Sequence, residues 1–354
     1  MLSRSQTKKD KLRVRILGND NIGWSIDTDR KNVTRLLSTE GFFEVIETIF
    51  HADVLYSVWY NLLERPYIYY PLKVLKKLRK VKVIATVTNE VQNTPDKISR
   101  LRSLIDIWIA PSKRTFDYLK SKDVKVIHIP FLVDKAIFKN LNTDKKVLAD
   151  TLGIGFDTIS GKTLIGSFQR DSLGSNLSMP KWQKNPDLLI EILKNLPKEK
   201  FILLLAGPRR HYVIGECKKF DIPYLFIGDE TFVREGKDDI FENNLPLERV
   251  NLLYNLSDVC LVTSKSEGGP KAVLECALTK TLVFSTDVGL ARDILHGSLI
   301  YSEIEPQAAI GKLQDFISGK IRYTNEIQYN HITVTDALNE SRILDTLKKA
   351  LYEN

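Results

Sequence analysis

Short apolar runs alternate with longer amphipathic stretches along most of the chain. The runs that predict buried strands lie at residues 14–18, 81–87, 105–110, 124–129, 162–168, 201–207, 223–228, 258–264 and 281–286. They are rich in β-branched residues, as parallel strands covered on both faces are. Helical periodicity separates several of them and is clearest at residues 185–196, where Asn185 fits an N-cap and Pro186 the first helical position. Alternating strands and helices predict an α/β protein with doubly wound parallel sheets.

The apolar runs fall into two series, separated by a polar segment that contains Gly153, Gly155 and Gly161. This division predicts a Rossmann-like N-terminal domain at residues 1–140, a linker at 141–160 and a second Rossmann-like domain at 161–330. Residues 331–354 form a C-terminal segment, whose part from 335 onward has the period of one amphipathic helix. Ala337, Leu338, Ile343, Leu344 and Leu347 lie on its apolar stripe.

Composition narrows the class of protein without identifying a partner. The 354 residues are 43% hydrophobic and 27% charged, which fits a globular protein and excludes a disordered one. Lys and Arg number 52 against 44 Asp and Glu, and the net charge of +8 favours anionic partners. The three cysteines have neither metal-ligand nor redox spacing, which is typical of a reducing compartment. The sequence shows neither a long apolar span nor a signal-peptide pattern, so we expect a cytoplasmic protein.

The segment with the most distinct chemistry follows the apolar run at 258–264. There Glu267, Gly268 and Gly269 form a loop, and Pro270 begins a helix that carries Glu275. Glycines let the backbone approach a phosphate closely, and the first amides of a helix point at it with the helix dipole behind them. A carboxylate placed further along the helix can accept hydrogen bonds from the two hydroxyls of a ribose.

This segment resembles the E-x7-E motif of retaining glycosyltransferases with the GT-B fold, family 4. Further similar segments lie in the family's order at residues 109–119, 129–138, 165–171, 183–189 and 203–213, so the resemblance covers most of residues 105–295. The resemblance implies two tandem Rossmann-like domains that face each other across a cleft, with a C-terminal helix that packs back on the N-terminal domain. It also implies a nucleotide-sugar donor bound mainly by the C-terminal domain.

Carried over by position, the resemblance assigns Arg170 and Lys184 to a cationic clamp on the donor diphosphate and Glu267 to the donor sugar. Glu275 would hold the ribose, and the remaining donor-binding positions are Gly207, Pro208, Gly268, Gly269, Pro270 and Lys271. The clamp departs from the family pattern, because residues 171–183 separate the two cations where the family has only a few residues. We interpret this inserted loop as part of the acceptor side.

On the acceptor side the sequence gives fewer signals, and the candidates are Trp24, Asp27, Asn89 and Glu90. The strand at 81–87 is followed by Asn89 and Glu90, without the histidine that many family members have there. The Asp27-Thr28-Asp29 triplet matches the short pattern that binds a divalent metal in other glycosyltransferases. Because Asp27 and Thr28 also fit the N-cap of the next helix, we predict no metal site.

A basic helix is predicted at residues 71–82, which begin with Pro71 and end with Lys82. At 100° per residue its lysines at 73, 76, 77 and 80 share one face, and Leu72, Leu75 and Leu78 the other. Two interpretations fit: contact with anionic lipid or polysaccharide at a membrane surface, or a solvated helix that covers the sheet. No recognition motif for nucleic acid is present, so nucleic acid is not an expected partner.

The sequence as a whole predicts a metal-independent glycosyltransferase without a cofactor. It would move a sugar from a nucleotide donor to a hydroxyl of a glycan or lipid-linked glycan, and the family resemblance implies retention of configuration. Two alternatives remain: a non-hydrolysing nucleotide-sugar epimerase with the same architecture, and a nucleotide-sugar-binding protein without turnover.

Overall fold

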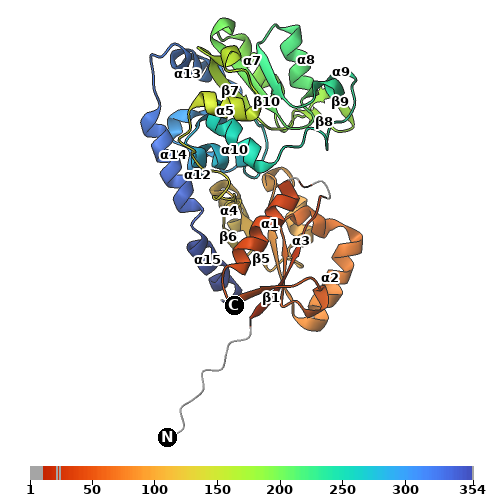
Figure 1. The fold of residues 1–354 in the computed structure, drawn as a ribbon. Coiled ribbons are helices and arrows are strands. Elements are labelled where there is room, and N and C mark those ends of the chain that lie inside the picture. The colour runs from red at the N-terminus through yellow and green to blue at the C-terminus, as the bar shows by residue number, and fades with distance from the viewer. Residues whose placement is uncertain (1–10, 21–22, 24, 353–354) are drawn as a thin grey trace. The chain divides into compact units, whose positions relative to one another are not determined.

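The computed structural model describes residues 11–20, 23 and 25–352, and these form two compact units (Figure 1). Unit 1 comprises the described residues up to Leu132 together with those from Asn339 onward, and unit 2 comprises Val133–Leu338. Each unit has its own parallel sheet and its own core. This confirms the predicted α/β class with two Rossmann-like domains.

The sheet of unit 1 has the strand order β2-β1-β3-β4-β5-β6 among the described residues, and every neighbouring pair is parallel. Its strands are β1 (Leu12–Leu17), β2 (Phe43–Val45), β3 (Val54–Ser57), β4 (Lys82–Thr86), β5 (Ile107–Ala110) and β6 (Val126–His128). Its helices are α1 (Ser25–Ser38), α2 (Pro66–Arg79), α3 (Pro95–Leu101), α4 (Lys113–Lys120) and α15 (Glu340–Tyr352).

Alternate residues of the unit 1 strands enter two separate cores, one on each face of the sheet. In β5, Ile107 and Ile109 belong to one buried cluster, whereas Trp108 and Ala110 belong to the other. Because successive side chains of a strand point to opposite faces, a strand that is covered on both faces must be apolar throughout. This is why strands such as β4 and β5 were visible in the sequence as continuous apolar runs.

The sheet of unit 2 has the order β11-β10-β7-β12-β13-β14 among the described residues, again with parallel neighbours. Its strands are β7 (Thr163–Ser167), β10 (Phe201–Ala206), β11 (Tyr224–Ile227), β12 (Val259–Val262), β13 (Leu282–Thr286) and β14 (Ile300–Tyr301), and β8 (Ser172–Leu173) and β9 (Asn176–Pro180) form a separate antiparallel pair. Its helices are α5 (Lys145–Leu152), α6 (Phe156–Ile159), α7 (Pro186–Lys194), α8 (His211–Lys219), α9 (Glu230–Arg234), α10 (Leu247–Leu256), α11 (Lys271–Thr279), α12 (Ala291–Ile294), α13 (Gln307–Ile317) and α14 (Thr324–Ala337). If the six strands of this sheet are numbered 1 to 6 along the chain, their order in the sheet is 3-2-1-4-5-6, which is the order found in dinucleotide-binding folds.

Each apolar run in the sequence overlaps one of these strands, and α7 begins at Pro186 with Asn185 as N-cap, as predicted. The short strands β2, β3, β8, β9 and β14 were not predicted. The segment expected as a linker, residues 141–160, forms α5 and α6 and packs within unit 2 through Leu148 and Leu152, while the units divide between Leu132 and Val133.

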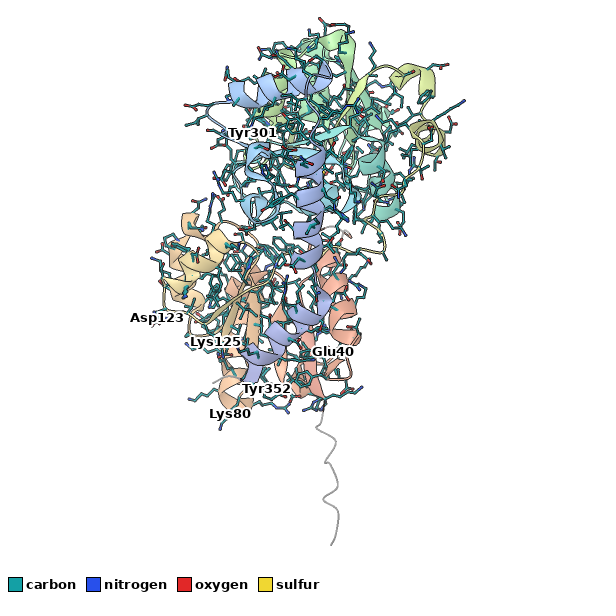
Figure 2. All side chains as sticks on the ribbon, turned by 90° about the vertical axis from the view of Figure 1, so that its left-hand side faces the viewer. Glu40, Lys80, Asp123, Lys125, Tyr301 and Tyr352 are labelled. Carbon is teal, nitrogen blue, oxygen red and sulfur yellow. The ribbon has the colours of Figure 1, made fainter. Side chains whose placement is uncertain are left out.

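The C-terminal segment forms two helices, so the prediction of one continuous helix from residue 335 is wrong. Helix α14 ends at Ala337 within unit 2, and α15 begins at Glu340 within unit 1. The apolar stripe of α15 is buried in one core of unit 1 beside β1, as the predicted return of this helix requires. Tyr352 lies edge-on to Phe42 at 5.7 Å between ring centroids, and Lys348 pairs with Glu40 (Figure 2).

The basic helix α2 differs from the sequence prediction in its bounds and in its buried face. It begins at Pro66 and continues through Pro71. Leu72 is buried, but Leu78, expected on the same covered face, is 76% exposed. Lys76 points inward and pairs with Asp106 at 2.6 Å. Within the described residues, none of the helices has both the length and the apolar character needed to cross a membrane.

Candidate functional site

The strand order of unit 2 reverses direction between β7 and β12, which are direct neighbours in the sheet. In open α/β sheets, ligands bind at such a switch point, just beyond the carboxyl ends of the strands. Here Arg170 follows β7 and Glu267 follows β12. The sheet topology therefore brings two of the predicted site residues to the edge where a ligand is expected.

Lys184 and Glu267 form the best-defined contact at this edge. The Lys184 ammonium lies 2.7 Å from Glu267 Oε1, and the two side chains are 21% and 15% exposed. Ser264 donates a hydrogen bond to the same carboxylate oxygen. The two loops are also joined by two hydrogen bonds to backbone carbonyls. The Lys265 amide donates to the Gln183 carbonyl at 2.8 Å, and the Thr263 hydroxyl donates to the Lys184 carbonyl at 3.0 Å.

The long insertion between the two predicted cations forms the β8–β9 hairpin and closes on itself. The Lys181 amide donates to the Asp171 carbonyl at 2.6 Å, and the Lys184 amide donates to the Lys181 carbonyl at 2.9 Å. The chain therefore leaves β7 at Ser167, passes Arg170, and returns beside Asp171 before it reaches Lys184. Both cations therefore lie close enough to Lys181 for their charges to act on it.

Lys181 lies in the same group of charges as Arg170, Lys184 and Glu267, and it was not predicted from the sequence. Burial is the largest cause that lowers the pKa of its ammonium, to about 8, and the charges of Arg170 and Lys184 lower it further, while Glu267 acts in the opposite direction. Four cationic groups, those of Lys181, Arg170, Lys184 and Arg209, thus share one electrostatic neighbourhood with the carboxylate of Glu267. The signal that could have revealed it is the presence of two lysines three positions apart after Pro180.

The hairpin is anchored by an ion pair that is fully inside unit 2. Asp171 Oδ2 lies 2.8 Å from Arg210 Nε, and the two side chains are 3% and 0% exposed. Asp171 Oδ1 accepts from the Val213 amide at 3.3 Å, and Ser172 Oγ accepts from the Tyr212 amide at 2.9 Å, so both residues satisfy the N-terminal turn of α8. Burial raises the pKa of the Asp171 carboxyl, and the charge of Arg210 opposes that shift.

The glycine turn ahead of α11 is buried under a neighbouring loop. Gly268, Gly269 and Pro270 are all buried, and Pro270 is the N-cap of α11. Gly289 has a φ of +50°, and a Cβ there would lie 2.7 Å from the Glu267 carbonyl oxygen. A side chain at 289 would therefore displace the turn that carries Glu267. Lys271, in the first turn of α11, is half-buried.

Glu275 lies on α11 and has a fixed hydrogen-bond partner. Tyr254 donates to Glu275 Oε2 at 2.7 Å, and its ring packs edge-on against Phe168 at 5.1 Å between centroids. Burial raises the pKa of the Glu275 carboxyl, whereas the Tyr254 hydrogen bond and the Lys271 charge lower it. The carboxylate is therefore held in position by an aromatic residue that is itself packed.

Gly207 and Pro208 leave β10, the neighbour of β7, at the same carboxyl edge. Gly207 has a φ of +84°, and the turn leads to Arg209, which makes a bidentate pair with Asp238 at 2.9 and 2.7 Å. Among the residues that the structure describes, no hydrogen bond joins Gly207 or Pro208 to the Lys184–Glu267 pair. Their place at this edge is the only support for the predicted donor role.

The predicted acceptor-side residues lie in unit 1, and Trp24 falls outside the described residues. Asp27 lies in the first turn of α1, accepts from the Gly23 amide at 3.0 Å and pairs with Arg30 at 3.7 Å. Because α1 begins at Ser25, the prediction of an N-cap at Asp27 or Thr28 is wrong. Asn89 and Glu90 follow β4, where Glu90 pairs with Arg114 at 3.7 Å.

Unit 1 also has a small cavity at the carboxyl edge of its sheet. Asp29, Tyr56 and Thr86 form its polar wall, and Phe131 is among its apolar lining residues. Burial raises the pKa of Tyr56 to about 12, and Thr86 donates a hydrogen bond to the Tyr56 oxygen at 3.4 Å. In the part of the chain that the structure describes, no three His, Cys, Asp or Glu side chains gather closely enough to hold a metal ion.

Comparison with solved structures gives matches over nearly the whole chain. Anabaena HepE in complex with UDP and glucose matches at 12% identity over 96% of this chain and 99% of that chain, with a TM-score of 0.68. The sucrose-phosphate synthase of Thermosynechococcus elongatus matches at 11% identity over 97% and 99%, with a TM-score of 0.69. A UDP-forming α,α-trehalose-phosphate synthase from Burkholderia vietnamiensis matches at 12% identity over 83% and 70%, with a TM-score of 0.58.

No protein-family model matches the chain, and no curated protein matches its sequence. At the identities above, the structural likeness establishes the fold. The chain has the GT-B fold, the two-domain architecture of a large class of glycosyltransferases, as the sequence predicted.

Proposed function

We propose that this protein is a glycosyltransferase that takes its sugar from a nucleotide donor bound by unit 2. The observation that carries the proposal is the Lys184–Glu267 pair at the switch point of the second sheet. The helix that follows this site carries the Tyr254-bound carboxylate of Glu275. The fold that the chain shares with HepE, whose structure holds UDP and glucose, supports the same function.

In the proposed reaction, the side chains of Arg170 and Lys184 bind the diphosphate of the donor. They stabilise the negative charge that develops on it as the bond to the sugar breaks. Arg170 can bind two phosphate oxygens at once, whereas Lys184 acts as a point charge. Glu267 accepts hydrogen bonds from the donor sugar, and Glu275 from the ribose. Because these cations can neutralise the diphosphate, the proposal includes no metal requirement. The E-x7-E resemblance supports transfer with retention of configuration to a hydroxyl of a glycan or lipid-linked glycan.

A thermal-shift screen of the full chain against UDP-, GDP- and ADP-sugars tests donor binding. A ligand at 100 times its dissociation constant stabilises the folded state by about 2.7 kcal/mol, so one group of nucleotides should raise the melting temperature. The responding donor is then incubated alone and with glycan acceptors. Transfer only with acceptor supports the proposal. An altered nucleotide sugar formed without acceptor would indicate an epimerase, and binding without turnover a binding protein.

Replacing Glu275 with alanine should remove the ability of the site to distinguish ribose from deoxyribose. A hydrogen bond to a charged group contributes about 1.5–3 kcal/mol, so the affinity for the ribonucleotide should fall by roughly 10- to 100-fold. The measurement is calorimetric titration with UDP and with dUDP, or with the corresponding pair for the base that binds. Wild type should prefer the ribonucleotide, and the variant should bind both equally. A preference that survives in the variant would contradict the role of Glu275.

We also propose that helix α2 of unit 1 lies on a membrane surface that contains anionic lipid. Its exposed apolar residues are Tyr67, Tyr70, Val74 and Leu78. At 100° per residue these four positions fall within one stripe of the helix. The exposed Lys73 and Lys77 border that stripe along one side, Lys80 projects from the end of the helix (Figure 2), and α2 contains no acidic residue. An apolar stripe bordered by lysines matches the chemistry of an anionic lipid–water boundary.

Replacing Leu78 with glutamate should reduce co-sedimentation of the protein with vesicles that contain phosphatidylserine by at least about fivefold. The reason is that the variant places a charge in the stripe that enters the lipid boundary, and one surface charge changes the free energy of binding by about 1 kcal/mol. The matched control is Val147→Glu on α5, which alters another exposed apolar residue. Equal binding of wild type to neutral vesicles, or binding to a soluble anionic polysaccharide in place of vesicles, would contradict the proposal.

A further inference from the structure

The base of the β8–β9 hairpin places Lys181 beside Arg170 and one turn before Lys184. Its backbone amide is bonded to the Asp171 carbonyl, and its own carbonyl accepts from the Lys184 amide. We propose that Lys181 is a third cation of the donor site and binds the diphosphate together with Arg170 and Lys184. This inference rests on the proposed function and assigns to the inserted hairpin a donor-binding role in place of the acceptor role expected from the sequence.

The charges of the cluster support this assignment. Of the charges that act on Lys181, those of Arg170, Lys184 and Arg209 are positive and that of Glu267 is negative, and the diphosphate of a nucleotide sugar carries a charge of about −2, one for each ionised phosphate. Among the described residues, no ion pair engages the ammonium of Lys181. Gathering like charges in a half-buried place is unfavourable unless an anion joins them. A diphosphate supplies such an anion.

The neighbouring Arg209 shows what a structural cation at this edge looks like. Its guanidinium donates two hydrogen bonds to the Asp238 carboxylate, and this pairing raises its pKa. Lys181 has the opposite character, because burial and the charges of Arg170, Lys184 and Arg209 lower its pKa to about 8, with only Glu267 opposing them. A perturbed group of this kind at the switch point is a candidate for function rather than for stability.

The lowered pKa has a measurable consequence for binding. Below pH 8 most of the Lys181 side chains are protonated, and above it most are neutral. An anion stabilises the protonated form and raises this pKa, so donor binding near pH 8 must take up protons from solution. The affinity for the diphosphate should therefore fall as the pH rises through about 8.

The experiment is calorimetric titration of the full chain with UDP, GDP and ADP at pH 8, in two buffers of different ionisation enthalpy. The terminal phosphate of these ligands has a pKa of about 6, so it is already ionised at this pH. The difference in binding enthalpy between the buffers then measures proton uptake by the protein. We expect uptake approaching half a proton per molecule bound by wild type.

Two variants separate charge from structure. Lys181→Arg keeps the charge at all relevant pH values, so it should bind tightly without proton uptake and without the loss of affinity above pH 8. Lys181→Met keeps the apolar stem and the backbone hydrogen bonds, and should bind about 10- to 100-fold more weakly, also without uptake. The control is Lys146→Met, an exposed lysine on α5 that should behave as wild type.

The outcomes distinguish this inference from the proposed function. If none of the nucleoside diphosphates binds to wild type, the proposed function fails. If one binds but wild type takes up no protons, or if Lys181→Met binds as tightly as wild type, then the site binds nucleotide without Lys181 and the inference is overturned. Circular dichroism of each variant establishes that it is folded.

Discussion

Replacing Lys184 with alanine is expected to lower the rate of sugar transfer by at least about 100-fold. Removal of one positioned group that stabilises developing charge in a transition state costs a factor of about 100 to 1,000 in enzymes. Lys184 is the only cation of the cluster, among the described residues, that the structure pairs with the carboxylate assigned to the donor sugar. Steady-state assays with saturating donor, on the acceptor identified by the transfer screen, measure the effect.

The matched control is Lys265→Ala, which removes an exposed ammonium from the same pair of loops and keeps the backbone bond to the Gln183 carbonyl. It should transfer at nearly the wild-type rate. Lys184→Ala also leaves Glu267 without its ion-pair partner, so melting curves must establish that the variant is folded. Turnover close to wild type in a folded Lys184→Ala protein would refute the clamp.

The fold could be predicted from the sequence because the strands and helices of the cores have a periodic pattern of apolar residues. A central strand such as β10 is buried along its whole length, from Phe201 to Ala206, and therefore appears as an uninterrupted apolar run. Edge strands carry a weaker signal: β2 has only Phe43 buried and escaped prediction. The break between α14 and α15 was not predicted for another reason. Leu338 is buried and continues the apolar pattern beyond the end of α14, so the sequence shows no interruption there.

Only part of the candidate site could be predicted from the sequence. Lys184, Glu267 and Glu275 could be proposed because short motifs and helix positions identify them, and the structure brings the first two together. Lys181 was missed, although it lies three positions before Lys184, because its proximity to Arg170 depends on the closure of a hairpin, and antiparallel pairing over a few residues has no distinct pattern. The importance of Asp171 was hidden as well, since its partner Arg210 belongs to a different strand–helix unit.

The hairpin thus connects the chemistry of the site to the stability of unit 2. Arg170 is the residue before Asp171, and Lys181 bonds back to the Asp171 carbonyl, so the buried Asp171–Arg210 pair fixes the point where the hairpin leaves and re-enters the sheet edge. A site that collects three cations needs a rigid support, because their mutual repulsion would otherwise spread them apart. The buried ion pair and the cap on α8 supply that support.

Replacing Asp171 with alanine should therefore reduce the stability of unit 2 by about 3–5 kcal/mol, the cost of leaving one partner of a buried ion pair without the other. The variant leaves the fully buried Arg210 charge uncompensated and the Val213 amide without its acceptor. Urea unfolding followed by circular dichroism measures the change. Hydrogen exchange of β7 and β10 amides assigns the transition to unit 2.

The comparison variant is Asp238→Ala, which removes an ion-pair partner of Arg209 close to the same hairpin. Asp238 is 38% exposed, so water solvates the arginine that remains, and the expected loss is at most about 1 kcal/mol. The contrast between two arginine–aspartate pairs on consecutive arginines isolates the effect of burial. Equal losses in the two variants would show that the hairpin is not anchored by its buried charge, and the rigid support inferred for the cationic cluster would then lose its basis.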